Sequence, residues 1–527
     1  MSTTHERDAT GAPFALDDDV NHETNEPLRP KRTSLPKFQL FIVFLIQFSE
    51  PITATVIYPF VNQFVRDTGV TRGDERKTGY YAGIIESVFF LAEALTVFHW
   101  GWASDRFGRR PILLLGPIGL SIAMLSFGLS KSFWPLVVSR CLQGVFNGNI
   151  GVSKSVIAEI TDSTNIADVF AMMPLIWSCG TTLGPIIGGM LSQPARSWPA
   201  IFGRVVFFHN YPYFLPCAVA ALLALASGLI ASIGLKETLP AAVLREKKRK
   251  AKAAAQFTDA NPSSMTSLLG GENGTTYGSN GFVEALENDY TPEVGVPHSS
   301  EPDVDPSHAP PPFRALLVPK VLIPLMVYAF LTFVDMSTQV LLPLIYSTSI
   351  SMGGLGFDPY RIGLIMGTWG VINAVVQLCF LGKLIRKFGP RKIQIIAQSS
   401  YVVVLSTYPL LNFFARRAGT VDVKVWAVII IQLTFAMTNY PAFASIHIII
   451  LDSAPTRASL GATNGMAQAV GSIMRSIAPS AASSLFSVSL ERHLAGGNMV
   501  FIILAAIGLV GLRSTFLLPK HSRSLNH

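Results

Sequence analysis

The sequence predicts an all-α membrane protein of twelve transmembrane helices, arranged as two pseudo-symmetric six-helix bundles. Of its 527 residues, 50% are hydrophobic and only 14% are charged, a balance typical of a chain surrounded by lipid. Apolar runs long enough to cross a bilayer as a helix, which takes about 20 residues, recur along the chain. A short basic loop between two such runs occurs at 101–110 and again, in a weaker copy, at 382–392. A duplicated membrane bundle is typical of a secondary transporter.

Each predicted span must be a helix, because the polar groups of an open backbone cannot be satisfied in lipid. The spans form an N-terminal bundle at 37–235 and a C-terminal bundle at 319–518. In chain order they are 38–63, 79–103, 111–130, 133–157, 167–192, 212–235, 320–346, 360–385, 391–414, 424–451, 458–486 and 497–518.

Three polar segments lie outside the predicted bundles. The N-terminal tail at 1–36 and the linker at 236–318 are predicted to be disordered, because they contain too few apolar residues to form a core. A short tail at 519–527 follows the last span. No apolar run precedes Phe38, so we expect the first span, and not a cleaved signal peptide, to insert the chain.

The distribution of basic residues predicts the orientation in the membrane. The net charge is +8, but the Lys and Arg residues gather in the loops on one side of the spans and do not form a nucleic-acid-binding patch. Basic loops remain in the cytoplasm, so both termini and the linker are expected there. The basic run at 245–250 would then lie close to anionic lipid headgroups. We expect an integral protein of the plasma membrane or the vacuolar membrane.

The loop between the second and third spans carries the pattern Gly-x-x-x-Asp-Arg-x-Gly-Arg-Arg. Glycine permits a tight turn, and an aspartate at a helix end can pair with an arginine or cap a neighbouring helix. Such a contact would hold the cytoplasmic face in one conformation. The alternative is that the positive charges only orient the helices. The candidate conformational latch consists of Gly101, Asp105, Arg106, Gly108, Arg109 and Arg110.

Ionisable residues inside a membrane span are costly and mark functional sites. Glu50 and Asp335 lie at equivalent places in the first and seventh spans, near the membrane midplane. Burial favours the neutral form of a carboxyl group, so both are candidates to carry a coupling proton. Arg140, in the fourth span, needs a carboxylate or an aqueous cavity, unless its side chain reaches the membrane surface. Glu86 and Glu93 share one face of the second span. Either they take part in function like the other ionisable residues of the spans, or they pair with residues near the latch.

Other polar residues are expected to line a central cavity or its edge. Arg475 would serve as a counter-ion for Asp335 or for an anionic substrate. Lys154 and Glu159 are expected to be solvated or paired near the cytoplasmic end of the fourth span. The candidates for substrate contact are Gln47, Asn147, Gln339, Asn439 and Arg475.

Taken together, these motifs resemble the major facilitator superfamily. The loop at 101–110 matches its signature between the second and third spans. Residues 140–144 resemble its Arg-x-x-x-Gly motif, which in the family takes part in proton transfer, so the resemblance makes Arg140 a third candidate for proton coupling. Residues 180–189 look like the Gly-x-x-x-Gly-Pro-x-x-Gly-Gly motif of its proton antiporters, in which glycines allow close helix contact and proline bends the helix. The motif residues are Gly180, Gly184, Pro185, Gly188 and Gly189.

The first half also resembles one branch of the twelve-span drug:proton antiporter group. Segments 80–83, 211–216 and 236–240 look like the zinc-induced facilitator-like branch and its fungal relatives. The Cys-Pro-Gly-Cys-Pro segment of the plant members is missing here, which puts their link with metal homeostasis in doubt for this chain.

The resemblance implies a secondary active transporter that moves a small organic solute, a drug-like compound or a metal chelate by proton antiport with alternating access. A proton-coupled symporter or facilitator of a small nutrient is an alternative, and a transport-inactive membrane sensor is an alternative of another class. No nucleophile–base pair, metal-ligand cluster or phosphate-binding loop is evident, so we expect neither an enzyme nor an ATP-driven pump. The expected protein has no cofactor or metal and is a monomer. It uses a proton gradient and interacts with its substrate, protons and the bilayer.

Overall fold

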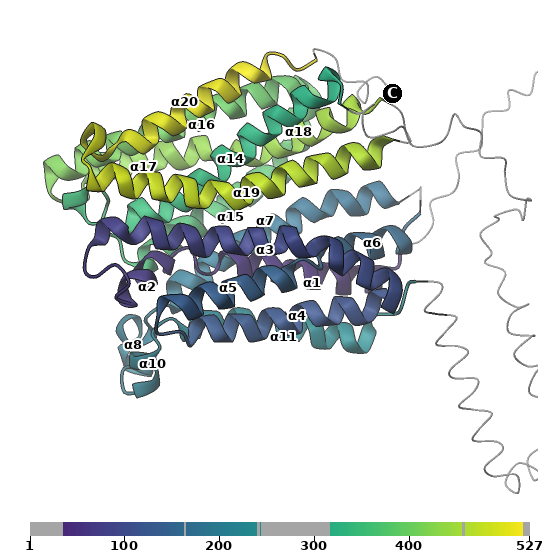
Figure 1. Cartoon of the computed structure of the whole chain (residues 1–527), viewed down its shortest axis with the longest axis horizontal. Coiled ribbons are helices and arrows are strands. Elements are labelled where there is room, and N and C mark those ends of the chain that lie inside the picture. Colours follow the sequence, from purple (N-terminus) through teal and green to yellow (C-terminus); the bar gives the residue numbers. More distant parts are fainter. Residues whose placement is uncertain (1–34, 163–164, 240–242, 244–316, 456–458, 520–527) are drawn as a thin grey trace, which may run out of the picture.

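The computed structural model describes residues 35–162, 165–239, 243, 317–455 and 459–519. Within these ranges the chain forms helices and no strand, and the long helices run along one axis of the molecule (Figure 1). Seven helices of this described part are long and apolar enough to cross a membrane by length and composition. Most of the predicted N-terminal tail, most of the linker and most of the C-terminal tail lie outside the described residues. The predicted all-α membrane fold is confirmed.

The N-terminal half contains the helices of the first six predicted spans. They are α1 (Lys37–Thr55) with α2 (Val61–Asp67), α3 (Thr78–Phe107), α4 (Arg109–Gly128), α5 (Phe133–Asn147) with α6 (Ile150–Ile160), α7 (Ile166–Leu191) and α11 (Phe214–Gly234). The sequence does not predict four short elements between them, which are η1 (Glu75–Lys77), α8 (Pro194–Ser197), α9 (Pro199–Phe202) and α10 (Val206–Asn210).

The C-terminal half contains the helices of the last six predicted spans. They are α14 (Pro319–Ser347), α15 (Pro359–Phe388), α16 (Pro390–Ala418), α17 (Val423–Ala436) with α18 (Asn439–Ser453), α19 (Leu460–Glu491) and α20 (Met499–Thr515). Two short helices, η4 (Ile350–Met352) and η6 (Leu494–Gly497), lie in its connections. Each half has its own clusters of buried hydrophobic side chains.

Three predicted spans are not single helices. The first is interrupted at 56–60, where Pro59 lacks the N–H that a continuous helix needs. The fourth is interrupted at 148–149 and the tenth at 437–438. Just before each of these two breaks, a tryptophan of a facing helix donates its indole N–H to a main-chain carbonyl: Trp100 to Val145 (2.6 Å) and Trp369 to Leu433 (2.8 Å). The two halves therefore share broken helices at equivalent places.

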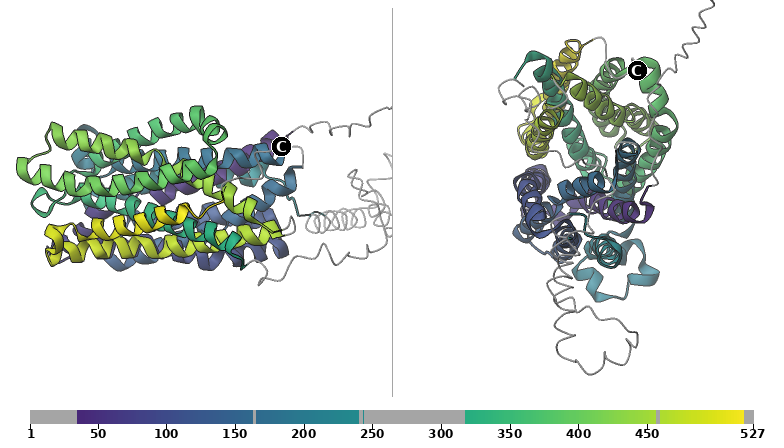
Figure 2. Two further views of the ribbon diagram at one scale, coloured as in Figure 1. Left: turned by 90° about the horizontal axis from the view of Figure 1, so that it is seen from above. Right: turned by 90° about the vertical axis from the view of Figure 1, so that its right-hand side faces the viewer.

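The two halves contact each other along two pairs of helices, α3 with α19 and α7 with α15. Seen along the helices, the N-terminal half (purple to teal) and the C-terminal half (green to yellow) form separate groups (Figure 2). α3 and α19 run side by side in Figure 1. They are antiparallel, because Gly79 faces Ser487 while Gly83 faces Pro479.

This contact is confined to one end of the molecule. A Cβ at Gly83 would lie 3.0 Å from the Pro479 carbonyl oxygen, and one at Gly189 would lie 2.5 Å from the Gly363 Cα. By contrast, a Cβ at Gly101 or at Gly465 would have nothing within 4 Å. We name the end that carries α2 the α2 end, and the end that carries residues 101–110 the loop end. The halves are closed against each other at the α2 end and apart at the loop end.

Candidate transport site and gates

A polar cluster lies between α1, α3 and α5 inside the N-terminal half. The side-chain amide nitrogen of Asn147 donates hydrogen bonds to Glu50 Oε1 (2.8 Å) and to Glu93 Oε2 (3.1 Å). Glu50 and Asn147 are buried, whereas Glu93 is half-buried. The structure thus joins two residues that the sequence singled out, Glu50 and Asn147, through one amide to a second carboxylate.

Arg140 of α5 is paired inside this half. Its guanidinium binds Glu86 Oε2 at 3.2 Å, with both side chains at most 2% exposed. It also donates to the Ala54 carbonyl (2.9 Å) and to Gln143 Oε1 (2.7 Å), and it lies 4.4 Å from the centre of the Phe89 ring. The alternative in which Arg140 reaches the membrane surface is therefore wrong. Glu86 pairs with this arginine and not with the latch.

Asp335 of α14 occupies the equivalent site in the C-terminal half. Its Oδ1 accepts a hydrogen bond from the Tyr401 hydroxyl (2.7 Å), and its Oδ2 accepts one from the Gln339 amide (2.7 Å). Asp335 and Tyr401 are both buried. Sequence reasoning did not identify Tyr401, because a tyrosine in an apolar run gives no signal of its polar contact.

Two basic residues act on these carboxylates. Lys154 of α6 and Arg475 of α19 each interact electrostatically with Glu50 and with Glu93. Arg475 also interacts electrostatically with Asp335 in its own half, and its role as a counter-ion stays a prediction. Lys154, expected to be solvated or paired near the cytoplasmic end of its span, interacts electrostatically with the central carboxylates.

The remaining predicted cavity residues give a mixed picture. Gln47 is buried in α1, and its amide nitrogen has no hydrogen-bond partner among the described residues. The side-chain amide of Gln339 donates a hydrogen bond to Asp335. Asn439 begins α18, but its side chain lies outside the described residues.

The loop at 101–110 makes its ion pairs within the N-terminal half. Arg109 binds Asp105 Oδ1 at 2.5 Å and Glu159 Oε1 at 2.9 Å, so the pairing expected for Glu159 occurs. Asp105 is 64% exposed, and in this conformation it pairs with Arg109, which lies just beyond the turn at the start of α4. A contact of Asp105 that holds the cytoplasmic face shut stays a prediction for a conformation in which the loop end is closed.

Sequence reasoning missed Glu237 as a partner of this loop. Its carboxylate accepts hydrogen bonds from the main-chain N–H groups of Arg109 (2.8 Å) and Arg110 (3.1 Å). These groups are at the N-terminus of α4, where a negative charge is favourable. Gly108, immediately before them, has a φ of 111°, which favours glycine. Glu237 and the glycine fix the turn between α3 and α4.

The glycines of the predicted antiporter motif pack α7 against helices of both halves. A Cβ at Gly180 would meet Pro51, one at Gly184 would meet Thr55, and one at Gly188 would meet Val56. Gly189 faces Gly363 of α15 across the interface between the halves. The motif therefore allows α7 to contact α1 on one side and α15 on the other.

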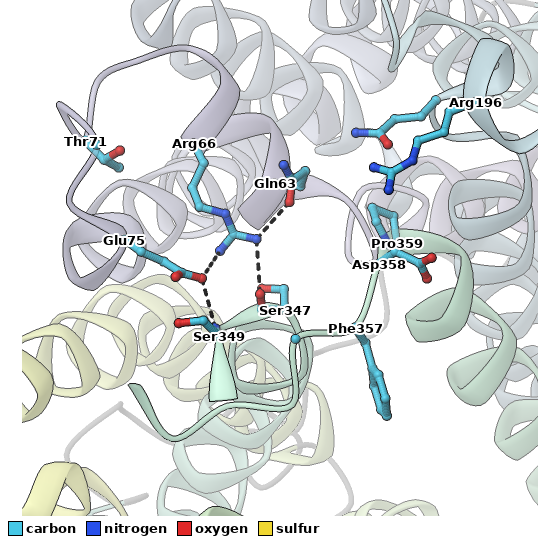
Figure 3. A pocket seen from close by; sticks show the side chains of 13 residues that line it. Gln63, Arg66, Thr71, Glu75, Arg196, Ser347, Ser349, Phe357, Asp358 and Pro359 are labelled. Carbon is cyan, nitrogen blue, oxygen red and sulfur yellow. Dashed lines mark hydrogen bonds and ion pairs between the residues drawn. The ribbon is translucent and has the colours of Figure 1, made fainter. Parts of the chain in front are cut away.

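At the α2 end, Arg66 joins the two halves (Figure 3). Its guanidinium donates to Glu75 Oε1 (3.3 Å) and Gln63 Oε1 (3.0 Å) in the N-terminal half, and to the Ser347 carbonyl (3.2 Å) in the C-terminal half. Glu75 Oε1 also accepts the Ser349 main-chain N–H (3.0 Å). Burial lowers the pKa of Arg66, and the charge of Glu75 opposes that shift, so the guanidinium remains charged.

A pocket of about 510 Å³ surrounds this contact. Figure 3 shows Arg66 on one side of it and Arg196 on the other, next to Asp358 and Pro359. Both halves contribute residues to its wall, which are Gln63, Arg66, Thr71, Gly73, Glu75, Gln193, Arg196, Ser347, Ser349, Gly356, Phe357, Asp358 and Pro359. This site lies in connecting segments, outside the spans that carry the residues predicted from the sequence.

Comparison with known proteins places the chain in a family. Residues 43–479 match the family model described as Major Facilitator Superfamily. The chain is 33% identical to the Major facilitator-type transporter psiT2 of Psilocybe cyanescens, over 91% of this chain and 90% of the relative. It is 28% identical to the Major facilitator superfamily multidrug transporter mfsB of Aspergillus fumigatus, over 87% and 80% of the two chains. It is 26% identical to Protein ZINC INDUCED FACILITATOR-LIKE 1 of Arabidopsis thaliana, over 93% of each.

Solved structures share the fold. A D-xylose–proton symporter superimposes with a TM-score of 0.62, covering 93% of this chain and 99% of its own, at 14% sequence identity. A bacterial homolog of the human lysosomal transporter Spinster, in an inward-facing conformation, gives 0.61, covering 93% and 100%, at 13% identity. The chain therefore belongs to the major facilitator superfamily of membrane transporters, among relatives that include zinc-induced facilitators, fungal multidrug transporters and efflux pumps.

Proposed function

We propose that this protein is a proton-coupled antiporter, which moves a small organic solute or drug-like compound across the membrane by alternating access. The observation that carries the proposal is the hydrogen-bonded cluster of Glu50, Asn147 and Glu93. Two carboxylates that share one amide donor inside a membrane bundle repel each other when both are ionised, which favours binding of a proton. Relatives named multidrug transporter and efflux pump support a drug-like substrate.

The positions of the two halves support alternating access. The halves meet at the α2 end through Arg66 and the paired glycines, and they are apart at the loop end. If the basic loop faces the cytoplasm, as the distribution of Lys and Arg predicts, this conformation is inward-open. We propose that the bundles at 37–235 and 319–518 rock about the central carboxylates, with both termini cytoplasmic.

The transport cycle needs few other components. We propose that the proton gradient is the energy source, that no cofactor takes part, and that the protein acts as a transporter and not as an enzyme. Its partners are the transported compound, protons and lipid, and the monomer is sufficient because each half supplies its own carboxylate, Glu50 or Asp335. The plasma membrane and the vacuolar membrane are both compatible sites for such a transporter.

The test begins with a deletion strain, whose sensitivity to a panel of drugs, metal chelates and organic acids identifies an exported compound. Purified protein is then placed in liposomes with an imposed pH gradient. Antiport moves protons toward the alkaline side, so the compound accumulates on the acidic side, beyond the level in protein-free liposomes. Symport would concentrate the compound on the alkaline side, and a facilitator would give no accumulation that depends on the pH gradient. Either result would overturn the proposal.

A further inference from the structure

Arg475 of α19 lies close to the point where the contact between α3 and α19 ends. The Ser480 main-chain N–H donates a hydrogen bond to Ser87 Oγ at 3.0 Å, which joins the two helices. With a rise of about 1.5 Å per residue, Glu93 lies about 9 Å beyond Ser87 along α3, and Arg475 lies about 7.5 Å from Ser480 along α19. Because the helices are antiparallel, Glu93 and Arg475 lie at similar depth on the open side of this contact.

The two basic residues near the carboxylate cluster, Lys154 and Arg475, belong to different halves. Lys154 belongs to the N-terminal half, as Glu50 and Glu93 do, and moves with them. Arg475 belongs to the C-terminal half and interacts with both carboxylates across the gap between the halves. Glu93 and Arg475 form no ion pair among the described residues, so their separation still exceeds the range of a direct contact.

Closure of the loop end brings α3 and α19 together at this depth, and it therefore moves Arg475 toward Glu93. We propose that Arg475 links conformation to protonation, by pairing with ionised Glu93 when the loop end closes and separating from protonated Glu93 when the loop end opens. This inference rests on the proposed proton antiport. Protonation of the cluster then favours the open loop end, and loss of the proton favours the closed loop end. Arg475 is a positioning residue in this scheme, because it acts through the carboxylates.

Other ionisable groups face this pair and define the controls. Glu50 and Lys154 flank Glu93 from α1 and α6. His447 of α18 and Asp335 of α14 interact electrostatically with Arg475. A change of pH can also titrate His447, so the variant His447→Gln separates its effect from that of Glu93.

The experiment measures the distance between spin labels at the loop end as a function of pH. Labels are placed on cysteines introduced at Phe107 of α3 and Leu460 of α19, both exposed, after the four native cysteines have been replaced. We expect acidic pH to shift the population toward the long distance by about five-fold or more, at the lower end of typical coupling between sites. Arg475→Gln should remove most of this shift, Arg475→Lys should retain it, and Glu93→Gln should hold the loop end open at all pH values.

The outcomes distinguish this inference from the proposed function. A normal pH-dependent change of the label distance in Arg475→Gln would overturn the role of Arg475. The same holds if the change is lost in His447→Gln but kept in Arg475→Gln. A pH-dependent shift that is retained in Arg475→Lys shows that the effect requires the positive charge and not the guanidinium group. If pH gradients drive transport but the wild-type distance does not change with pH, only this inference fails. If pH gradients drive no transport, the proposed antiport fails instead.

Discussion

The guanidinium of Arg66, on α2, donates a hydrogen bond of 3.2 Å to the main-chain carbonyl of Ser347, the last residue of α14. This bond crosses between the two halves at the α2 end. Glu75 reinforces it by accepting hydrogen bonds from both Arg66 and the Ser349 N–H. The conformational equilibrium can therefore be changed from this end of the molecule without touching the central carboxylates.

Arg66→Gln should open the α2 end more often. The substitution removes the ion pair with Glu75 and weakens the bond to Ser347. A hydrogen bond to a charged group contributes about 1.5–3 kcal/mol when buried, and the partial exposure of Arg66 reduces this, so we expect a shift of roughly five-fold. The measurement is the labelling rate of a cysteine at Ser487, which is buried in the seam between α3 and α19, by a membrane-impermeant maleimide.

The control is Arg196→Gln. Arg196 lines the same pocket but is exposed, and its guanidinium makes no hydrogen bond or ion pair among the described residues. Its loss should leave labelling at the wild-type rate. Equal labelling in both variants would show that Arg66 does not hold the halves together.

Alanine at Gly83 and at Gly465 should shift the two conformations in opposite directions. A Cβ at Gly83 would collide with the Ser483 hydroxyl and the main chain of Pro479, so Gly83→Ala should disfavour closure of the α2 end. Gly465 faces open space here, but the antiparallel register places it near Gly101 when the loop end closes. Gly465→Ala should therefore disfavour closure of the loop end. Both variants are measured with the cysteine at Ser487.

Gly508→Ala is the matched control, because its Cβ would meet only side chains of its own half, at 3.5 Å or more. All three variants gain the same helix propensity, so a general stabilisation cannot explain opposite shifts. Faster labelling in Gly83→Ala with slower labelling in Gly465→Ala is the expected result. Shifts in the same direction would contradict the register.

Breaking the ion pair between Arg140 and Glu86 should destabilise the fold. Both side chains are at most 2% exposed, and an uncompensated buried charge costs about 3–5 kcal/mol. Glu86→Gln and Arg140→Met should each lower the thermal unfolding temperature strongly. The double variant should lose less than the sum of the two, since neither charge remains. Thermal unfolding of the purified protein in detergent measures this.

Asp74→Asn serves as the comparison, because Asp74 pairs with Arg76 at the surface, where an ion pair contributes at most about 1 kcal/mol. Its unfolding temperature should stay close to that of the wild type. If the Arg140 and Glu86 variants are strictly additive, the two residues do not act as a pair.

The sequence predicted two groups of membrane helices because apolar runs recur along the chain, and it singled out Glu50, Asp335 and Arg140 because charge inside such a span is rare. It did not predict the breaks at 148–149 and 437–438, since the residues there remain compatible with a membrane helix and the competing indole donors, Trp100 and Trp369, come from other helices. The role of Arg66 was not predictable either, because its partner Ser347 is distant in the chain and contributes only a main-chain carbonyl.

Asp105→Asn should shift the population toward the open loop end. In this conformation Asp105 is 64% exposed, so its loss costs little, whereas the predicted latch in the closed conformation needs its charge. A loss of ~1–3 kcal/mol of coupling is enough to change the populations several-fold. Labelling of a cysteine at Gly465 should become faster. Unchanged labelling at normal expression would mean that the loop acts only in membrane topology.

The central claim is that the buried carboxylates exchange a proton for the transported compound, and simultaneous measurement of both fluxes tests it most directly. Liposomes with a pH-sensitive dye inside report proton movement while the accumulation of the compound is followed. The wild type should move protons opposite to the compound, and Glu50→Gln should abolish both gradient-driven fluxes while still binding the compound. Asp335→Asn should have the same effect or a smaller one. Full gradient-driven transport by the double variant Glu50→Gln, Asp335→Asn would contradict the account.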